Sequence, residues 1–227
     1  MRRERNRQMT SRFIALAWLT GLILLTALMP GAVAAEPPAG DKPAAGAAIK
    51  MSILLVTDGD FFLAKAIEAN GLSRVRIVTP DHYTATYSEG FDVIVFDRFT
   101  PAALPKTGGL LFVDSLPPGG VLKQSVDNKG SPLTIAASAV KDWKKDHPAM
   151  KAFTPTKLYV ESARKLEVPK DWTTLLEGDK GPLIVADGDA TRRRQIVLAF
   201  DVTKSNWPLR VSFPQFVLEA TQYLAGR

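Results

Sequence analysis

The sequence contains no cysteine and only two histidines, His82 and His147. Without cysteine the chain has no disulfides, no cysteine-ligated zinc or iron–sulfur cluster, and no thiol nucleophile. Neither histidine lies at metal-ligand spacing from another donor, and no G-x-S-x-G motif supplies an activated serine. The sequence therefore predicts no catalytic residue, no metal site and no cofactor.

Beyond the amino terminus the chain has almost no net charge. The net charge is +6, and residues 1–34, with five arginines and one glutamate, contribute four of these positive charges. The rest of the chain is nearly neutral, which gives little attraction for a phosphate backbone. The remaining basic cluster, residues 192–194, falls in a predicted hairpin turn. We therefore expect no binding to nucleic acid.

Residues 1–35 have the pattern of a signal peptide. An arginine-rich start is followed by the apolar segment 13–29, then by Pro30 and small residues ending at Ala35. We predict cleavage after Ala34 or Ala35 and export to the periplasm or the outer face of the cytoplasmic membrane. An uncleaved anchor is the alternative, because about 17 apolar residues is the lower limit for crossing a bilayer. The positive flank keeps the amino terminus in the cytoplasm under either interpretation.

Two further regions follow the predicted signal. Residues 36–48 are rich in proline, alanine and glycine without hydrophobic periodicity, which predicts a flexible tether. Residues 49–227 have the length and the apolar content of a single folded domain. We expect this domain to be exported, with the tether between it and the membrane if the signal is retained.

Strand-like and helix-like segments alternate in the first half of this domain. Continuous apolar runs predict buried strands, and residues 74–79 alternate as in a half-buried strand. Residues 61–70 have helical spacing, with Asp60 as the N-cap and Gly71 at the C-terminal end. This order predicts a parallel sheet covered on both faces. The buried strands are expected at residues 51–57, 92–97 and 109–113.

The second half has a different pattern. Residues 114–151 are predicted to be rich in loops, with a short helix near residues 139–145. The last two strand-like runs are separated by a polar turn and are predicted to pair as a hairpin. A final amphipathic helix is expected over residues 213–224. The strand-like runs of this half are residues 158–162, 172–178, 182–188 and 195–202.

Acidic residues follow several apolar runs, and ligands in open α/β sheets bind beyond the carboxyl ends of strands. Asp58, Asp97 and Asp201 are therefore candidate pocket residues. Such carboxylates could bind a hard cation, but capping helices and ending strands is the interpretation that we prefer for them. His147 is a further candidate, as a general base or as a residue that fixes the loop before Pro148.

Asn206 and Trp207 belong to a Ser-Asn-Trp-Pro-Leu segment near the end of the chain. Trp207 is large and apolar, and its N–H needs a partner when buried. We expect a packed corner between the last strand and the last helix. The functional alternative is an aromatic anchor for a protein partner.

Several segments together resemble a known family. In chain order they resemble the glutamine amidotransferase-like domain that follows the von Willebrand factor A domain in bacterial Bat-type (aerotolerance) membrane proteins. The resemblance extends over most of residues 51–226, although the sequence contains neither the von Willebrand domain nor multiple membrane spans. The segments are residues 92–101 (DVIVFDRFTP), Leu104-Pro105, Trp143 with His147-Pro148, and residues 181–186 (GPLIVA), 196–202 (IVLAFDV), 205–209 (SNWPL) and 213–216 (FPQF).

The resemblance implies a three-layer α/β sandwich of the class I glutamine amidotransferase-like (flavodoxin-like) kind. Its sheet would be mainly parallel, with a C-terminal β-hairpin and a final helix. The chemistry of that class needs a cysteine nucleophile, which this sequence lacks. The fold is thus expected without its reaction.

Two functions remain open. The preferred one is an exported, non-enzymatic module of the cell envelope that contacts other envelope proteins, such as a von Willebrand domain encoded separately. The alternative is a small-ligand-binding or hydrolytic protein that uses the acidic strand ends and His147, with Ser115 or Ser138 as a possible nucleophile. This alternative predicts a pocket in which Asp58, Asp97 or Asp201 meets a histidine.

Overall fold

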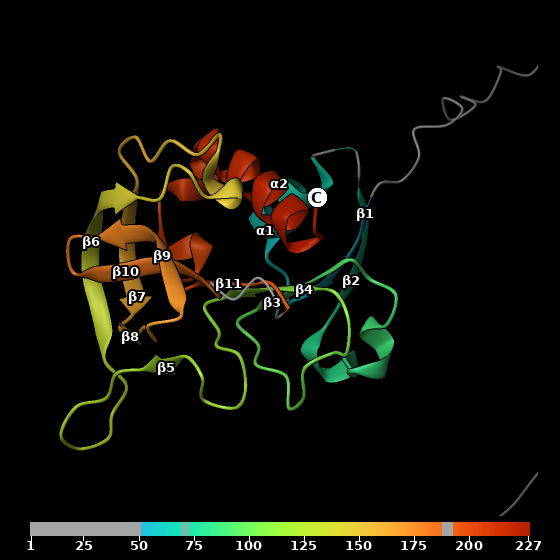
Figure 1. Cartoon of the computed structure of the whole chain (residues 1–227), viewed down its shortest axis with the longest axis horizontal. Coiled ribbons are helices and arrows are strands. Elements are labelled where there is room, and N and C mark those ends of the chain that lie inside the picture. Colours follow the sequence, from blue (N-terminus) through green and yellow to red (C-terminus); the bar gives the residue numbers. More distant parts are fainter. Residues whose placement is uncertain (1–50, 70, 72, 188–192) are drawn as a thin grey trace, which may run out of the picture. The chain divides into compact units, whose positions relative to one another are not determined.

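A nine-stranded mixed sheet forms the centre of the structure (Figure 1), a computed structural model that describes residues 51–69, 71, 73–187 and 193–227. The strands are β1 (Met51–Val56), β2 (Ser73–Val78), β3 (Val93–Asp97), β4 (Gly109–Val113), β6 (Thr134–Trp143), β7 (Tyr159–Arg164), β9 (Trp172–Gly178), β10 (Gly181–Asp187) and β11 (Gln195–Leu198). Their order in the sheet is β2-β1-β3-β4-β11-β10-β9-β6-β7. A separate two-stranded sheet pairs β5 (Lys123–Gln124) with β8 (Leu166–Glu167).

The sheet has a parallel half and an antiparallel half. Strands β2, β1, β3, β4 and β11 are parallel, and β10, β9, β6 and β7 continue the sheet antiparallel to their neighbours. β3 and β4 are buried at every residue, and apart from Asp97 at the end of β3 their sequences are continuously apolar, as strands covered on both faces require. The predicted hairpin is confirmed, since β10 pairs with β11.

The central strands of the sheet are covered on both faces, which confirms the predicted α/β sandwich. α1 (Phe61–Glu68) and α2 (Ser212–Leu224) lie against each other on one face (Figure 1). The other face carries no α-helix among the described residues. It is covered by loops and by the 3₁₀ turns η1 (Pro80–His82) and η2 (Thr86–Ser88). Between these turns, the Tyr83 ring lies 5.2 Å from that of Phe96 in β3.

Helix α1 is bounded by the two residues that the sequence predicted, Asp60 before it and Gly71 after it. The Asp60 side chain accepts a hydrogen bond from Leu63 N at 2.9 Å, as the N-cap prediction requires. Beyond the helix, Gly71 adopts φ +61° and donates its N–H to Glu68 O at 3.2 Å. This left-handed conformation favours glycine, which explains why the helix stops there. The final helix is also confirmed, as α2.

The helix predicted near residues 139–145 is wrong, because residues 139–143 belong to β6 and a turn follows them. Alanine favours helix locally, but β6 pairs with β7 on one side and with β9 on the other. These non-local pairings override the local preference. Loops and 3₁₀ turns nevertheless occupy much of residues 114–151, as expected.

The predicted signal (residues 1–35), its apolar segment 13–29 and the tether (residues 36–48) lie outside the described residues. Within residues 51–69, 71, 73–187 and 193–227, no helix has both the length and the apolar character needed to span a bilayer.

Candidate binding site at the carboxyl edge of the sheet

Polar side chains gather where the parallel strands end. Asp97 closes β3, Asp114 follows β4, and Asp201 lies three residues beyond β11. Thr57 follows β1 at the same edge. Because β1, β3, β4 and β11 run in one direction, their carboxyl ends bring these side chains to one edge of the sheet.

Arg98 connects two of the predicted candidates. Its Nη2 donates to Asp97 Oδ2 at 3.0 Å, and its Nη1 lies 3.6 Å from Asp201 Oδ2. Thr57 Oγ1 donates to the same Asp97 oxygen at 2.6 Å. Arg98 itself has φ +52°, a left-handed conformation that is costly for a residue with a side chain. The structure thus brings Asp97 and Asp201 together around one guanidinium.

Two carboxyl groups at this edge are buried and incompletely hydrogen-bonded. Asp60 Oδ2 and Asp97 Oδ1 have no hydrogen-bond partner within the described parts of the chain. Burial raises the pKa of Asp60 and of Asp97 above the ordinary value, because it disfavours the charged form. The helical N–H of Leu63 opposes this effect at Asp60, and the Thr57 hydroxyl opposes it at Asp97.

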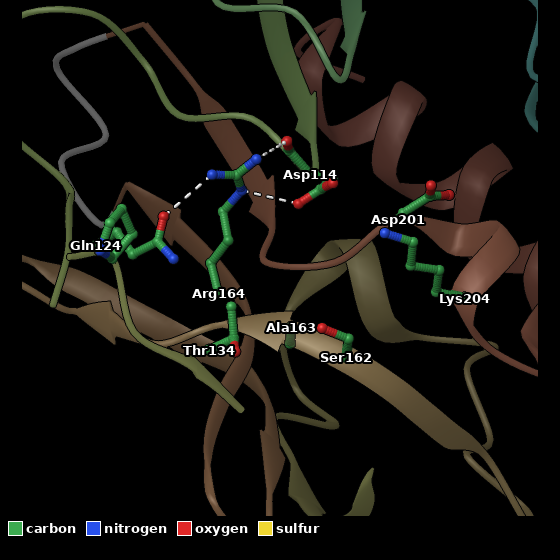
Figure 2. Close-up of a pocket in the computed structure, with 9 residues that line it drawn as sticks. Asp114, Gln124, Thr134, Ser162, Ala163, Arg164, Asp201 and Lys204 are labelled. Carbon is green, nitrogen blue, oxygen red and sulfur yellow. Dashed lines mark hydrogen bonds and ion pairs between the residues drawn. The ribbon is translucent and has the colours of Figure 1, made fainter. Parts of the chain in front are cut away.

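A second ion pair lies beside the first cluster. Arg164, at the end of β7, donates from Nε to Asp114 Oδ1 and from Nη2 to Asp114 O, both at 2.8 Å. Its Nη1 donates to Gln124 Oε1 at 3.1 Å (Figure 2). Burial raises the pKa of Asp114, and the charge of Arg164 opposes that rise. Asp114, like Arg98, is left-handed, with φ +44°.

Asp201 of the first cluster and the Arg164–Asp114 pair border a cavity of about 300 Å³ (Figure 2). A volume of this size is at the lower end for small-molecule sites. No three acidic, histidine or cysteine side chains lie in a metal-binding arrangement among the described residues. The lining residues are Asp114, Gln124, Pro132, Thr134, Ser162, Ala163, Arg164, Asp201 and Lys204.

Asp58 and His147 do not join this site. Asp58 is exposed on the turn between β1 and α1. His147 is half-buried near the opposite edge of the sheet, where its ring lies 4.6 Å from that of Tyr223 in α2. Tyr223 in turn contacts Arg194, which precedes β11. The pocket predicted to combine an acidic strand end with His147 is therefore not formed.

His147 has a local structural role. Its Nδ1 accepts a hydrogen bond from Ala149 N at 3.2 Å and caps the 3₁₀ turn η3 (Pro148–Met150). Burial lowers the pKa of His147, and the positive charges of Lys144 and Arg194 lower it further. A neutral imidazole can accept this bond, which agrees with a residue that fixes the loop before Pro148.

Trp207 is fully buried, as the preferred interpretation predicted. Its ring packs among aromatic rings at centroid distances of 5.0–6.0 Å, and its Nε1 donates to Ser212 Oγ at 3.3 Å. A side chain without exposed surface is not available as an anchor for a partner. The surrounding rings belong to Phe153, Phe200, Phe213 and Phe216.

Asn206 also holds the fold together. Its Oδ1 accepts from Tyr159 N at 3.0 Å, and its Nδ2 donates to Lys157 O at 2.9 Å. These bonds attach the start of β7 to the segment after β11. Asn206 therefore positions one wall of the cavity without lining it.

The sequence interpretation missed Asp114, Gln124, Arg164 and Lys204. Asp114 carries the same signal as Asp97 and Asp201, because it directly follows a continuous apolar run. For Arg164 and Gln124, no pattern in the neighbouring sequence predicts a place in the site. They reach the site only through the long-range contacts of β7 and of the small sheet.

No protein-family model matches the sequence, and no curated protein matches it. Two solved structures share the fold. Cytoplasmic protein STM3548 from Salmonella typhimurium has a TM-score of 0.57 and 11% identity, covering 76% of this chain and 98% of that chain. Cytoplasmic protein STM1381 from Salmonella typhimurium LT2 has a TM-score of 0.50 and 14% identity, covering 78% and 98%. Identities this low establish similarity of fold alone.

A third solved structure, a ThuA-like protein from Bacteroides uniformis, has a TM-score of 0.47 and 10% identity, covering 76% of this chain and 89% of that chain. A TM-score this low does not establish a shared fold. The α/β sandwich assignment depends on the sheet topology and on the two Salmonella structures.

Proposed function

We propose that this chain is an exported, non-catalytic α/β module of the cell envelope that binds another envelope protein. The observation that carries the proposal is a set of exposed apolar side chains at the start of α1 and in the residues just before α2. Phe61 is 65% exposed, Leu209 80% and Val211 76%, with Phe62 beside them at 39%. Single exposed apolar residues are ordinary, but a group of them is typical of a protein-binding surface.

A shallow apolar groove accompanies these residues, and Val211 is part of its lining. The groove has a volume of about 190 Å³ and lies between α1 and α2, with Ala66 and Ala69 on one side and Val211 and Leu218 on the other. Phe62 precedes Ala66 by one helical turn and so lies on the same face of α1. We call the exposed residues Phe61, Phe62, Leu209 and Val211, together with this groove, the α1–α2 apolar surface.

A non-catalytic role is supported by the chemistry at the carboxyl edge. The arginines there are bound to carboxylates, and His147 lies elsewhere. The sequence has no cysteine to act as a nucleophile. Covalent catalysis needs a nucleophile within hydrogen-bonding reach of a base. Thr79 Oγ1 lies 2.8 Å from His82 Nδ1 just after β2, but both belong to an exposed turn and neither lines the cavity. No serine is paired with a histidine at this edge among the described residues.

The partner that we propose is a von Willebrand factor A domain carried by a separate membrane protein. The sequence resemblance supports this choice, because in that family the two domains occur in one chain. The predicted signal places the module in the compartment where such a domain would meet it. Exposed apolar side chains can form the buried core of such an interface, which is more apolar than the rest of a protein surface.

Crosslinking in intact cells tests this proposal. We expect the protein to co-purify with a von Willebrand domain protein, and the double variant Phe61→Asp/Val211→Asp to lose that partner while keeping its melting temperature. Val126→Asp, at another exposed apolar site, is the matched control and should keep the partner. Recovery of no von Willebrand domain protein by the wild type, or equal recovery by the double variant, would refute the proposal.

A further inference from the structure

The cavity at the carboxyl edge lies between the two halves of the sheet. One wall comes from the ends of β4 and β11, with Asp114, Asp201 and Lys204. The other wall comes from β6 and β7, with Thr134, Ser162 and Arg164 (Figure 2). This surface is separate from the α1–α2 apolar surface, and no residue lines both.

Backbone hydrogen bonds hold the two walls at a fixed separation. Arg164 N donates to Ala199 O at 2.7 Å, and Val160 of β7 forms an antiparallel bridge with Ser205. The Arg164 side chain adds its two bonds to Asp114 across the same gap. The cavity is therefore preorganised, so that a ligand would bind with little loss of conformational entropy.

The left-handed backbone at Asp114 is a second sign of function. A non-glycine residue at φ +44° costs free energy that the surrounding contacts must offset. The same conformation recurs at Arg98, at the end of the neighbouring strand, and at Ala137 and Lys157, which do not line the cavity. Such residues concentrate at binding and active sites, where an unfavourable backbone directs a side chain into a site.

The unbound polar groups of the cavity include one cationic donor and two hydroxyls, which can both donate and accept. Among the described residues, the Lys204 ammonium and the hydroxyls of Thr134 and Ser162 make no hydrogen bond or ion pair, and Lys204 extends into the cavity (Figure 2). The carboxylate acceptors are partly engaged, because each has one oxygen, Asp114 Oδ2 and Asp201 Oδ2, that makes no hydrogen bond among the described residues. Asp114 is bound by Arg164, and Asp201 accepts from Thr203 N at 2.9 Å and lies near Arg98.

The charges of the lining limit the charge of a ligand. Arg164 and Lys204 balance Asp114 and Asp201, so the lining is neutral overall. A ligand with one negative charge can approach Lys204, whereas a dianion would be repelled by both carboxylates at short range. A carboxylate fits this requirement better than a phosphate, which carries nearly two charges at neutral pH.

From these observations we infer that the cavity binds a small monocarboxylate that carries hydroxyl groups. The carboxylate lies at the Lys204 ammonium, and the ligand hydroxyls exchange hydrogen bonds with Thr134 and Ser162. This site is independent of the proposed protein partner, because it lies on a different surface. Binding here involves no covalent step.

Calorimetric titration of the purified full-length protein tests the inference. The probes are glycolate, lactate, gluconate and glucuronate, with glucose as the neutral comparison and inorganic phosphate as the anionic one, all titrated at about pH 8 so that phosphate is mainly a dianion. We expect at least one of the four acids to bind more tightly than both comparisons. Lys204→Met should weaken that binding by about tenfold or more, since a hydrogen bond to a charged group contributes about 1.5–3 kcal/mol.

Two further variants complete the design. Lys204→Arg keeps the positive charge and should retain binding, and Lys170→Met removes an exposed lysine outside the cavity and should bind as the wild type does. The inference is overturned if none of the four acids binds, if phosphate or glucose binds as tightly, or if Lys204→Met binds like the wild type. These results are independent of the crosslinking experiment.

Discussion

Arg164 and Asp114 form a two-point contact across the middle of the molecule: Nε donates to the carboxylate and Nη2 to the backbone carbonyl, both at 2.8 Å. Fifty residues separate the two in sequence. The contact joins the parallel half of the sheet, through the end of β4, to the antiparallel half, through the end of β7. One ion pair thereby supports the fold and shapes the cavity.

Replacing Arg164 with methionine should destabilise the protein. The change keeps much of the aliphatic stem but leaves the partly buried Asp114 carboxylate without its cation. We expect a loss of about 1–2 kcal/mol in the free energy of unfolding, because both groups are partly screened by solvent. Urea denaturation measures it. Arg74→Met, at an exposed position on β2, should leave stability unchanged, and equal midpoints for both variants would contradict the role assigned to the pair.

Trp207→Ala should lower the free energy of unfolding more than Arg164→Met does. The indole is fully buried among four phenylalanine rings, and truncation leaves a cavity that these rings cannot fill. We expect a loss of about 3–5 kcal/mol, measured as a lower melting temperature or urea midpoint. A variant that melts like the wild type while losing a protein partner would instead support the anchor interpretation of this residue.

The buried carboxyl group of Asp97 predicts a pH dependence of stability. Because burial raises its pKa above 3.8, the folded state binds this proton more tightly than the unfolded state. Its contribution to stability is therefore present below pH 3.8 and is lost as the pH rises through the higher folded pKa.

The variant Asp97→Asn isolates this effect, because asparagine cannot ionise but can still accept from Thr57 and Arg98. Urea denaturation of both proteins from about pH 4 to about pH 7 gives the comparison. We expect the stability of the wild type to decrease relative to that of the variant as the pH rises. A constant or opposite difference would show that the folded state does not raise the pKa of Asp97.

Gly109→Ala tests the close packing of α2 on β4. A methyl group at this position would overlap the backbone carbonyl of Leu224 at the end of α2. The helix would have to move away from the sheet, and we expect a loss of about 1–3 kcal/mol in urea denaturation. Wild-type stability in this variant would mean that the end of α2 is free to shift.

Part of the candidate site could be predicted from the sequence. Asp97 and Asp201 follow continuous apolar runs, and such runs indicate buried strands whose ends carry the site. Asp114 has the same signal. Arg98 became significant only when the structure placed it between Asp97 and Asp201, since nothing in the order of residues gives the distance between the ends of β3 and β11.

The order of residues was enough to predict the features that depend on near neighbours: the buried strands β1, β3 and β4, the Asp60 cap of α1, and the hairpin of β10 and β11. It was not enough to show that the alanine-rich segment of β6 is a strand or that Arg164 reaches Asp114, and both of these emerged from the assembled sheet. The difference arises because burial periodicity and capping act over a few residues. Strand pairing and ion pairs between distant segments depend on a register that forms only when the whole sheet assembles.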